Sequence, residues 1–320
     1  MIRTQMTMRE HCQSLESELE SDGSARLIHQ PVMTAEIVSF LSPRPDGYYL
    51  DCTAGAGGHA RALLEAGAGQ VLALDRDPEV LPFARATLEP WSDRVEFVHT
   101  DFREIARVLD ERGISTIDGA VADLGMSSMQ IESEGRGFSF RRDEPLDMRM
   151  DRSQGPTVAG LLRDVPERVL ADLIFEYGEE RFSRRIARAI VSARQHKPLV
   201  TTAQLATLVR RVVPRKSRHR IDPATRTFQA LRIWVNGELD RLDLFLRCVC
   251  CRLRVGARIA VMSFHSLEDR IVKTVFRELG TGDDALVRVL TKRPIRPTDE
   301  EVVRNPRSRS AKLRIVERLA

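Results

Sequence analysis

Short apolar runs alternate with helix-like segments over the first part of the chain. Strands are predicted at residues 48–52, 71–75, 95–99 and 117–123, and amphipathic segments separate them. This alternation is typical of an α/β protein with a largely parallel sheet, since each crossover between parallel strands needs a helix.

The alternation stops after Asp123 and resumes about a hundred residues later. Residues 135–236 show only helical periodicity, with a capping box at Thr201–Gln204, and then a helix, a strand at 258–263 and a further helix follow. Two weaker strands are predicted near the end, at 286–290 and 312–316. We therefore expect one doubly wound sheet interrupted by a helical insert. The expected domains are a sheet domain over 26–134 and 237–320, an insert over 135–236 and a flexible extension over 1–25.

Composition excludes several classes of protein. The 320 residues are 42% hydrophobic and 30% charged, which is ordinary for a folded chain and excludes a fibrous or disordered one. No apolar run approaches the roughly 18 residues that cross a bilayer. The five cysteines are odd in number and lack C-x-x-C spacing, so neither disulfides nor a metal site are expected. These features favour a cytoplasmic protein.

Positive charge is concentrated in the insert. Residues 136–235 hold 21 Lys and Arg against 11 Asp and Glu, a local excess of +10, whereas the whole chain carries only +4 and the remainder therefore −6. Between residues 181 and 235, 14 bases accompany a single acid, Asp222. A field of this sign and density attracts polyanions, so the insert is predicted to contact nucleic acid.

Groups suited to an adenosine cofactor follow the first four predicted strands. A glycine turn with Gly57 and Gly58 follows the first, and Asp75 ends the second, 18 residues past Gly57, where a ribose diol needs an acceptor. Phe102 follows the third strand and Asp123 ends the fourth. The carboxyl ends of strands are where open α/β sheets bind ligands.

The glycine turn narrows the choice of cofactor without deciding it. It lacks the full G-x-G-x-x-G spacing of NAD sites, and no G-K-[ST] follows it, which excludes a P-loop. A methionine-bearing cofactor needs no phosphate cradle, and His59 directly after the glycines is expected to contact it. A nicotinamide dehydrogenase remains an alternative at this point.

Several longer runs carry a resemblance to a known family. They are Gly57-Gly58-His59, DLGMSSMQ at 123–130, RGFSF at 136–140, PLDMRMD at 145–151, YGEER at 177–181, PATRTFQALR at 223–232 and SFHSLEDR at 263–270. In this order they resemble the bacterial small-subunit ribosomal RNA cytosine-N4 methyltransferases of the MraW family, from about His29 to the closing NPRSRSAKL.

The resemblance implies a Rossmann-like class I S-adenosylmethionine methyltransferase with an inserted helical domain. It implies N4-methylation of a cytidine in the decoding region of 16S ribosomal RNA, the family's cytosine-1402, on the small ribosomal subunit. RNA, not DNA or a membrane, is the implied partner, and a homodimer stays open. The implied cofactor contacts are Gly57, Gly58, His59, Asp75, Phe102, Asp123 and Gln130, of which Gln130 rests on the family pattern alone.

The proton acceptor is not identified by the sequence. Many amino-methyltransferases use an Asp/Asn/Ser-Pro-Pro-aromatic turn to orient the amine, but the equivalent strand end here reads Asp123-Leu-Gly-Met. Asp123, a nearby backbone carbonyl and His265 remain alternatives, and His265 is equally suited to a structural hydrogen bond. A methyltransferase for another substrate and an assembly factor without turnover are the competing functions.

Overall fold

The computed structural model describes residues 31–214 and 222–319. The predicted extension over 1–25 and four bases of the insert, Arg215, Lys216, Arg218 and Arg220, lie outside this range. No helix among the described residues is long and apolar enough to cross a membrane.

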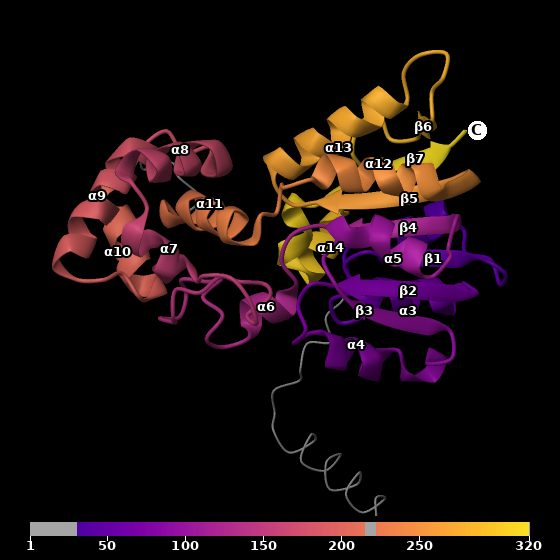
Figure 1. Ribbon diagram of the computed structural model, residues 1–320, viewed down its shortest axis with the longest axis horizontal. Helices are drawn as coiled ribbons and strands as arrows, with labels where there is room; N and C mark the ends of the chain where they lie inside the picture. Colours follow the sequence, from indigo (N-terminus) through magenta and orange to yellow (C-terminus); the bar gives the residue numbers. More distant parts are fainter. Residues whose placement is uncertain (1–30, 215–221, 320) are drawn as a thin grey trace, which may run out of the picture. The chain divides into compact units, whose positions relative to one another are not determined.

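One seven-stranded sheet forms the centre of the protein (Figure 1). Its order is β3-β2-β1-β4-β5-β7-β6, in which the first five strands are parallel and β7 runs antiparallel to both neighbours. This arrangement confirms the predicted Rossmann-like sheet. The bounds are β1 (Tyr48–Asp51), β2 (Gln70–Asp75), β3 (Val95–His99), β4 (Ile117–Asp123), β5 (Leu253–Ser263), β6 (Val287–Val289) and β7 (Lys312–Arg318).

Helices cover both faces of the sheet because neighbouring strand residues point to opposite sides. Leu50 and Leu72 belong to an apolar core with helices α5 (Ile105–Glu111), α12 (Leu242–Arg252) and α13 (Ser266–Leu279). Tyr49 and Val71, one position earlier, belong to a second core with α2 (Thr34–Leu41) and α3 (Gly58–Glu65). The smaller helices are α4 (Leu81–Thr87) and α14 (Asp299–Arg304).

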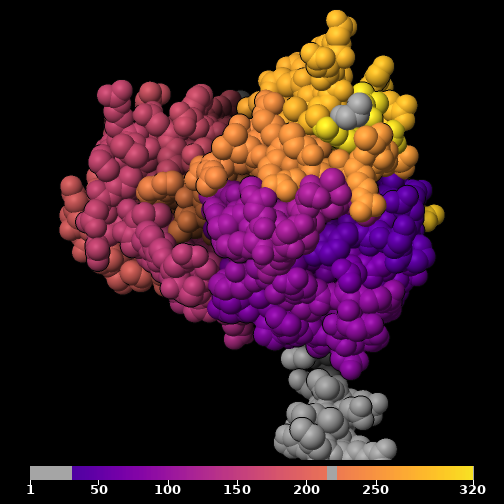
Figure 2. All heavy atoms as spheres, turned by 45° about the vertical axis from the view of Figure 1, so that its right-hand side comes forward, coloured from indigo at the N-terminus to yellow at the C-terminus, as the bar shows by residue number. Residues whose placement is uncertain are grey.

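The described residues between β4 and α12 form helices and contribute no strand to the sheet. They are α6 (Ser128–Glu132), α7 (Val158–Asp164), α8 (Glu167–Gly178), α9 (Ser183–His196), α10 (Thr202–Val212) and α11 (Ala224–Asn236). Helices α7 to α11 share their own apolar core. Figure 2 shows in addition that orange residues from the later part of the chain lie directly against purple residues from its first half, as the β4–β5 pairing requires.

Local signals account for several helix ends in this segment. Thr201 and Gln204 form the predicted capping box at the start of α10. Gly178 is the last helical residue of α8, and Glu179 takes the left-handed position after it. A Cβ on Gly178 would lie 2.6 Å from the Arg226 carbonyl oxygen, so close approach of α11 explains this glycine.

Candidate cofactor site and substrate edge

The glycine turn between β1 and α3 is held by a buried carboxylate. Gly57 has φ +87°, which a side chain disfavours, and it precedes the first turn of α3. Asp51, fully buried at the end of β1, accepts the backbone N–H groups of Thr53 and Ala60. Burial raises the pKa of Asp51. The turn is thus fixed before any ligand binds.

Asp75 lies at the carboxyl end of β2, against the same turn. Its Oδ2 accepts the Gly55 N–H at 2.7 Å and its Oδ1 accepts the Asp77 N–H at 2.8 Å. Burial is the main cause that raises the pKa of Asp75 to about 6, and the two backbone donors oppose it. Because each carboxylate oxygen has two lone pairs, Asp75 keeps acceptor capacity for ligand hydroxyls.

A buried His59 and a partly buried Asp123 lie side by side with free hydrogen-bonding capacity. The His59 Nε2 lies 3.6 Å from the Asp123 Oδ2, too far for a hydrogen bond. Both ring nitrogens of His59 and the Asp123 Oδ1 are buried without a hydrogen-bond partner among the described residues. Burial lowers the pKa of His59, but the carboxylates of Asp123 and Asp51 outweigh it and raise the value. Buried polar atoms without partners need an explanation, and a bound ligand is one that fits here.

Phe102 and Gln130 make their contacts apart from the His59–Asp123 pair. The Phe102 ring packs on Phe245 with 4.6 Å between ring centroids. Gln130 completes the capping box of α6 with Ser127, and its amide donates to the Asp77 Oδ2 at 2.9 Å. Gln130 therefore reaches Asp75 only through Asp77.

Asp77 is a buried carboxylate with several hydrogen-bond partners, and no sequence pattern indicated this role. Its Oδ2 accepts both Gln130 and the Arg136 Nη2, the latter at 2.6 Å, and its own N–H donates to Asp75. Arg136, which is 2% exposed, also donates to the carbonyl oxygen of Met150. A position in the RGFSF run was the only sequence signal for Arg136.

A cavity of about 580 Å³ opens beside the ends of β2 and β3. That volume lies within the usual range for small-molecule sites. Its walls include Asp101, which precedes Phe102, and Trp234 of α11. The guanidinium groups of Arg76 and Arg103 are already engaged there, with the Asn236 carbonyl oxygen and with Asp101.

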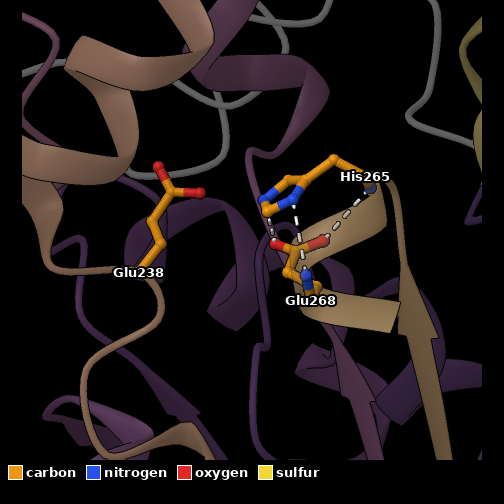
Figure 3. A group of neighbouring side chains, drawn as sticks. All are labelled: Glu238, His265 and Glu268. Atoms are coloured by element: carbon orange, nitrogen blue, oxygen red, sulfur yellow. Dashed lines mark hydrogen bonds and ion pairs between the residues drawn. The ribbon is translucent and has the colours of Figure 1, made fainter. Parts of the chain in front are cut away.

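His265 begins α13 as its N-cap (Figure 3). Its Nδ1 accepts the Glu268 N–H at 3.4 Å, and its Nε2 lies 3.1 Å from the Glu268 Oε1. The imidazole is 9% exposed, and Glu268 faces both of its nitrogens. The structural role of His265 is thus carried by Nδ1, whereas its Nε2 is buried near Glu268 without a hydrogen bond.

Glu238, His265 and Glu268 each offer a ligand atom within 4.8 Å of the others, which is the spacing of a metal site. Two contacts argue against a metal. Arg232 already holds both oxygens of Glu238 at 2.8 Å. A metal on the His265 Nε2 would place the proton on Nδ1, which faces the backbone N–H donor of Glu268. The cluster is better described as two neighbouring salt bridges, Arg232–Glu238 at the end of α11 and His265–Glu268 at the start of α13.

Exposed arginines mark the start of α9. Arg181, Arg184, Arg185 and Arg188 are all exposed. The guanidinium carbons of Arg181 and Arg185 lie 4.7 and 5.8 Å from the centroid of the Phe182 ring. Arg188 lies 3.5 Å from Glu167. Guanidinium groups ordered on an aromatic ring lose less freedom when they bind phosphates.

Comparison with known proteins gives one consistent family. A solved structure titled as a putative methyltransferase of Streptococcus mutans in complex with SAH matches 88% of this chain and 94% of its own chain. Its TM-score of 0.40 and identity of 14% mark only a distant likeness. A protein of Cyanothece is 51% identical over 95% of this chain and 97% of its own length. One from Pelobacter propionicus is 48% identical over 91% and 98%. Both are named ribosomal RNA small subunit methyltransferase H. The model of the MraW methylase family matches residues 26–319, and the chain belongs to that family.

Proposed function

We propose that this chain methylates a cytidine of small-subunit ribosomal RNA at N4, with S-adenosylmethionine as the methyl donor. The observation that carries the proposal is the His59–Asp123 pair beside the glycine turn, in which both His59 ring nitrogens and the Asp123 Oδ1 are buried without a partner. The shared name of relatives that match over nearly their whole length supports the RNA substrate. The target within 16S RNA, the family's cytosine-1402, follows from the resemblance.

The residues around the turn fit this cofactor. Asp75 would accept the ribose hydroxyls, and Gly57 and Gly58 would let the backbone approach. His59 would bind the carboxylate of the amino acid end and Asp123 Oδ1 its ammonium group, which would satisfy the unpaired atoms. Phe102 would wall the adenine side, with Gln130 supporting Asp75 through Asp77.

Methyl transfer from the cofactor to the cytosine amine requires the protein mainly to position the two groups. When bound, the cofactor supplies an electrophilic sulfonium methyl group. The chain must hold the cytosine amine in line with that methyl and accept hydrogen bonds from the amine, so that the nitrogen lone pair is directed away from the ring. Asp123 lies at the correct edge, whereas His265 is turned to Glu268. The group that finally takes the proton stays unassigned.

The insert would bind the RNA. The exposed arginines at the start of α9 offer guanidinium groups to phosphates, and phosphate contacts supply affinity without choice of base. Selection of one cytidine then requires RNA shape and an unstacked base. We therefore infer that the substrate is an assembled small subunit, and that the enzyme works in the cytoplasm where subunits are made.

Transfer of labelled methyl groups tests the proposal. Purified small subunits and protein-free 16S RNA are compared at equal concentration and salt, and the modified nucleoside is mapped by mass. We expect N4-methylcytidine at one position and faster transfer to the subunit. Label on another base or on protein would overturn the substrate, and equal rates on both RNAs would overturn the particle requirement. A thermal shift with NAD but none with S-adenosylmethionine would favour the dehydrogenase alternative.

A further inference from the structure

Glu179 adopts a backbone conformation that its side chain disfavours. It follows the last residue of α8 with φ +48° and ψ +36°, in the left-handed region. Glycine is the usual residue at this position because it has no Cβ to clash with the preceding turn. A strained conformation of this kind persists only where the surrounding structure holds the residue in place.

The Glu179 carboxylate joins α8 to α13. Its Oε2 accepts the Ser266 hydroxyl at 2.6 Å and its Oε1 accepts the Arg270 Nη2 at 2.9 Å. These two contacts lower the pKa of Glu179, so the carboxylate is ionised at neutral pH. The side chains of Glu179 and Arg270 remain 45% and 64% exposed, and exposed ion pairs contribute little to folding stability. Stability alone therefore does not account for the strained residue.

The place of the contact in the fold suggests another task. Ser266 begins α13 directly after β5, and Met262 near the end of β5 pairs with Asp123 of β4. The contact thus lies next to the edge where the cofactor residues gather. On the other side, α9 begins at Ser183, four residues beyond Glu179, and its first turns carry the exposed arginines.

We propose that Glu179 is a positioning residue that holds the basic insert at the carboxyl edge of the sheet, so that RNA bound on α9 meets the methyl donor. The proposal rests on the proposed function. It assigns Glu179 no contact with substrate or cofactor. Loss of the contact should misplace bound RNA without releasing it.

The Glu179→Gly variant separates positioning from folding. Glycine relieves the left-handed strain while it removes both contacts, so we expect a Tm equal to or above that of wild type. Cofactor affinity should be unchanged, and affinity for small subunits should stay within about threefold. We expect kcat to fall about 10- to 100-fold, since a misplacement of about 1 Å can cost 100-fold in rate. Glu176→Gln, at an exposed position of the same helix, is the control and should match wild type.

A second variant tests the partner. Arg270→Ala should lower kcat in the same direction, and the double variant with Glu179→Gly should be no slower than Glu179→Gly alone, because both remove one interaction. Wild-type kcat in Glu179→Gly, or independent multiplicative effects of the two changes, would overturn the proposal.

Hydrogen exchange gives a readout that does not depend on the proposed function. In Glu179→Gly, amide exchange should rise at residues 178–184 and 266–270, with no change in α3. Unchanged exchange at both segments would overturn the contact even if the wild type proved inactive on RNA. Raised exchange together with no methyl transfer by the wild type would instead count against the proposed function.

Discussion

Replacing Asp75 with alanine should weaken cofactor binding while the protein stays folded. In the native protein each carboxylate oxygen accepts one backbone N–H, from Gly55 or Asp77, and retains a lone pair for a ribose hydroxyl. Hydrogen bonds to a charged acceptor contribute about 1.5–3 kcal/mol. The dissociation constant should therefore rise about 10- to 150-fold.

Two effects on stability oppose each other in this variant. Alanine leaves the Gly55 and Asp77 N–H groups without their acceptor, which costs about 1–3 kcal/mol for each group that stays buried. Against this, the folded-state pKa of Asp75 is raised from 3.8 to about 6. A raised carboxyl pKa gives stability below about pH 4 that is lost as pH rises through about 6, so removal of Asp75 regains up to about 3 kcal/mol at pH 7.

Calorimetry with S-adenosylhomocysteine measures the affinity, and circular dichroism checks that the variant is folded. Asp93→Ala, at an exposed position after the turn that follows α4, serves as the control and should bind as wild type does. An unchanged dissociation constant for folded Asp75→Ala would remove Asp75 from the site and refute the reasoning.

Three further predictions follow from the same structure. Cofactor affinity should fall about tenfold between pH 8 and pH 5, because the Asp75 carboxyl group, whose pKa is about 6, is mostly protonated at pH 5. The fall should be absent in Asp75→Asn, and calorimetric titrations at several pH values check this. Charge reversal at Arg184, Arg185 and Arg188 should make the slope of log affinity for RNA against log salt concentration shallower by about 0.7–0.9 per lost contact, with cofactor affinity unchanged. Filter binding at several salt concentrations measures this slope, and an unaltered slope would mean that the arginines only face solvent. EDTA should leave the Tm and the activity on protein-free RNA unchanged, because Arg232 already holds both carboxylate oxygens of Glu238 beside His265. A Tm that EDTA lowers and zinc restores would contradict that assignment.

The sheet and its glycine turn were predictable because they depend on short-range patterns. Short continuous apolar runs, separated by helical segments, fix the strand positions to within a few residues. The longest discrepancy is β5, which begins at Leu253 and not at 258, because residues 254–256 are exposed and so lack the apolar signal. The strand continues there by backbone pairing of Leu253 with Ile117.

The polar network around Asp77 could not be predicted, because its members lie far apart in the sequence. Arg136 is 59 residues from Asp77, and nothing local distinguishes it from other arginines of a basic segment. Its burial follows from packing between the end of β2 and the loop around Met150. Gln130 was expected as a cofactor contact on the family pattern, and the structure adds its bond to Asp77, which no spacing rule indicates.

The position of helices α6 to α11 in the chain, between β4 and α12, explains how they can lie at the ligand-binding edge without disturbing the sheet. The connection from β4 to β5 must cross from the carboxyl edge to the amino edge, and α12 makes that crossing. Residues inserted before α12 therefore leave from and return to the carboxyl edge, where ligands bind in this class of fold. Both ends of the insert are tied to the residues after β2: Arg136 donates to Asp77, and the Asn236 carbonyl oxygen accepts Arg76. The turn that holds Asp75 and the two ends of the insert are thus linked through hydrogen bonds to residues 75–77. A substitution at Asp77 should therefore weaken the binding of cofactor and of RNA together.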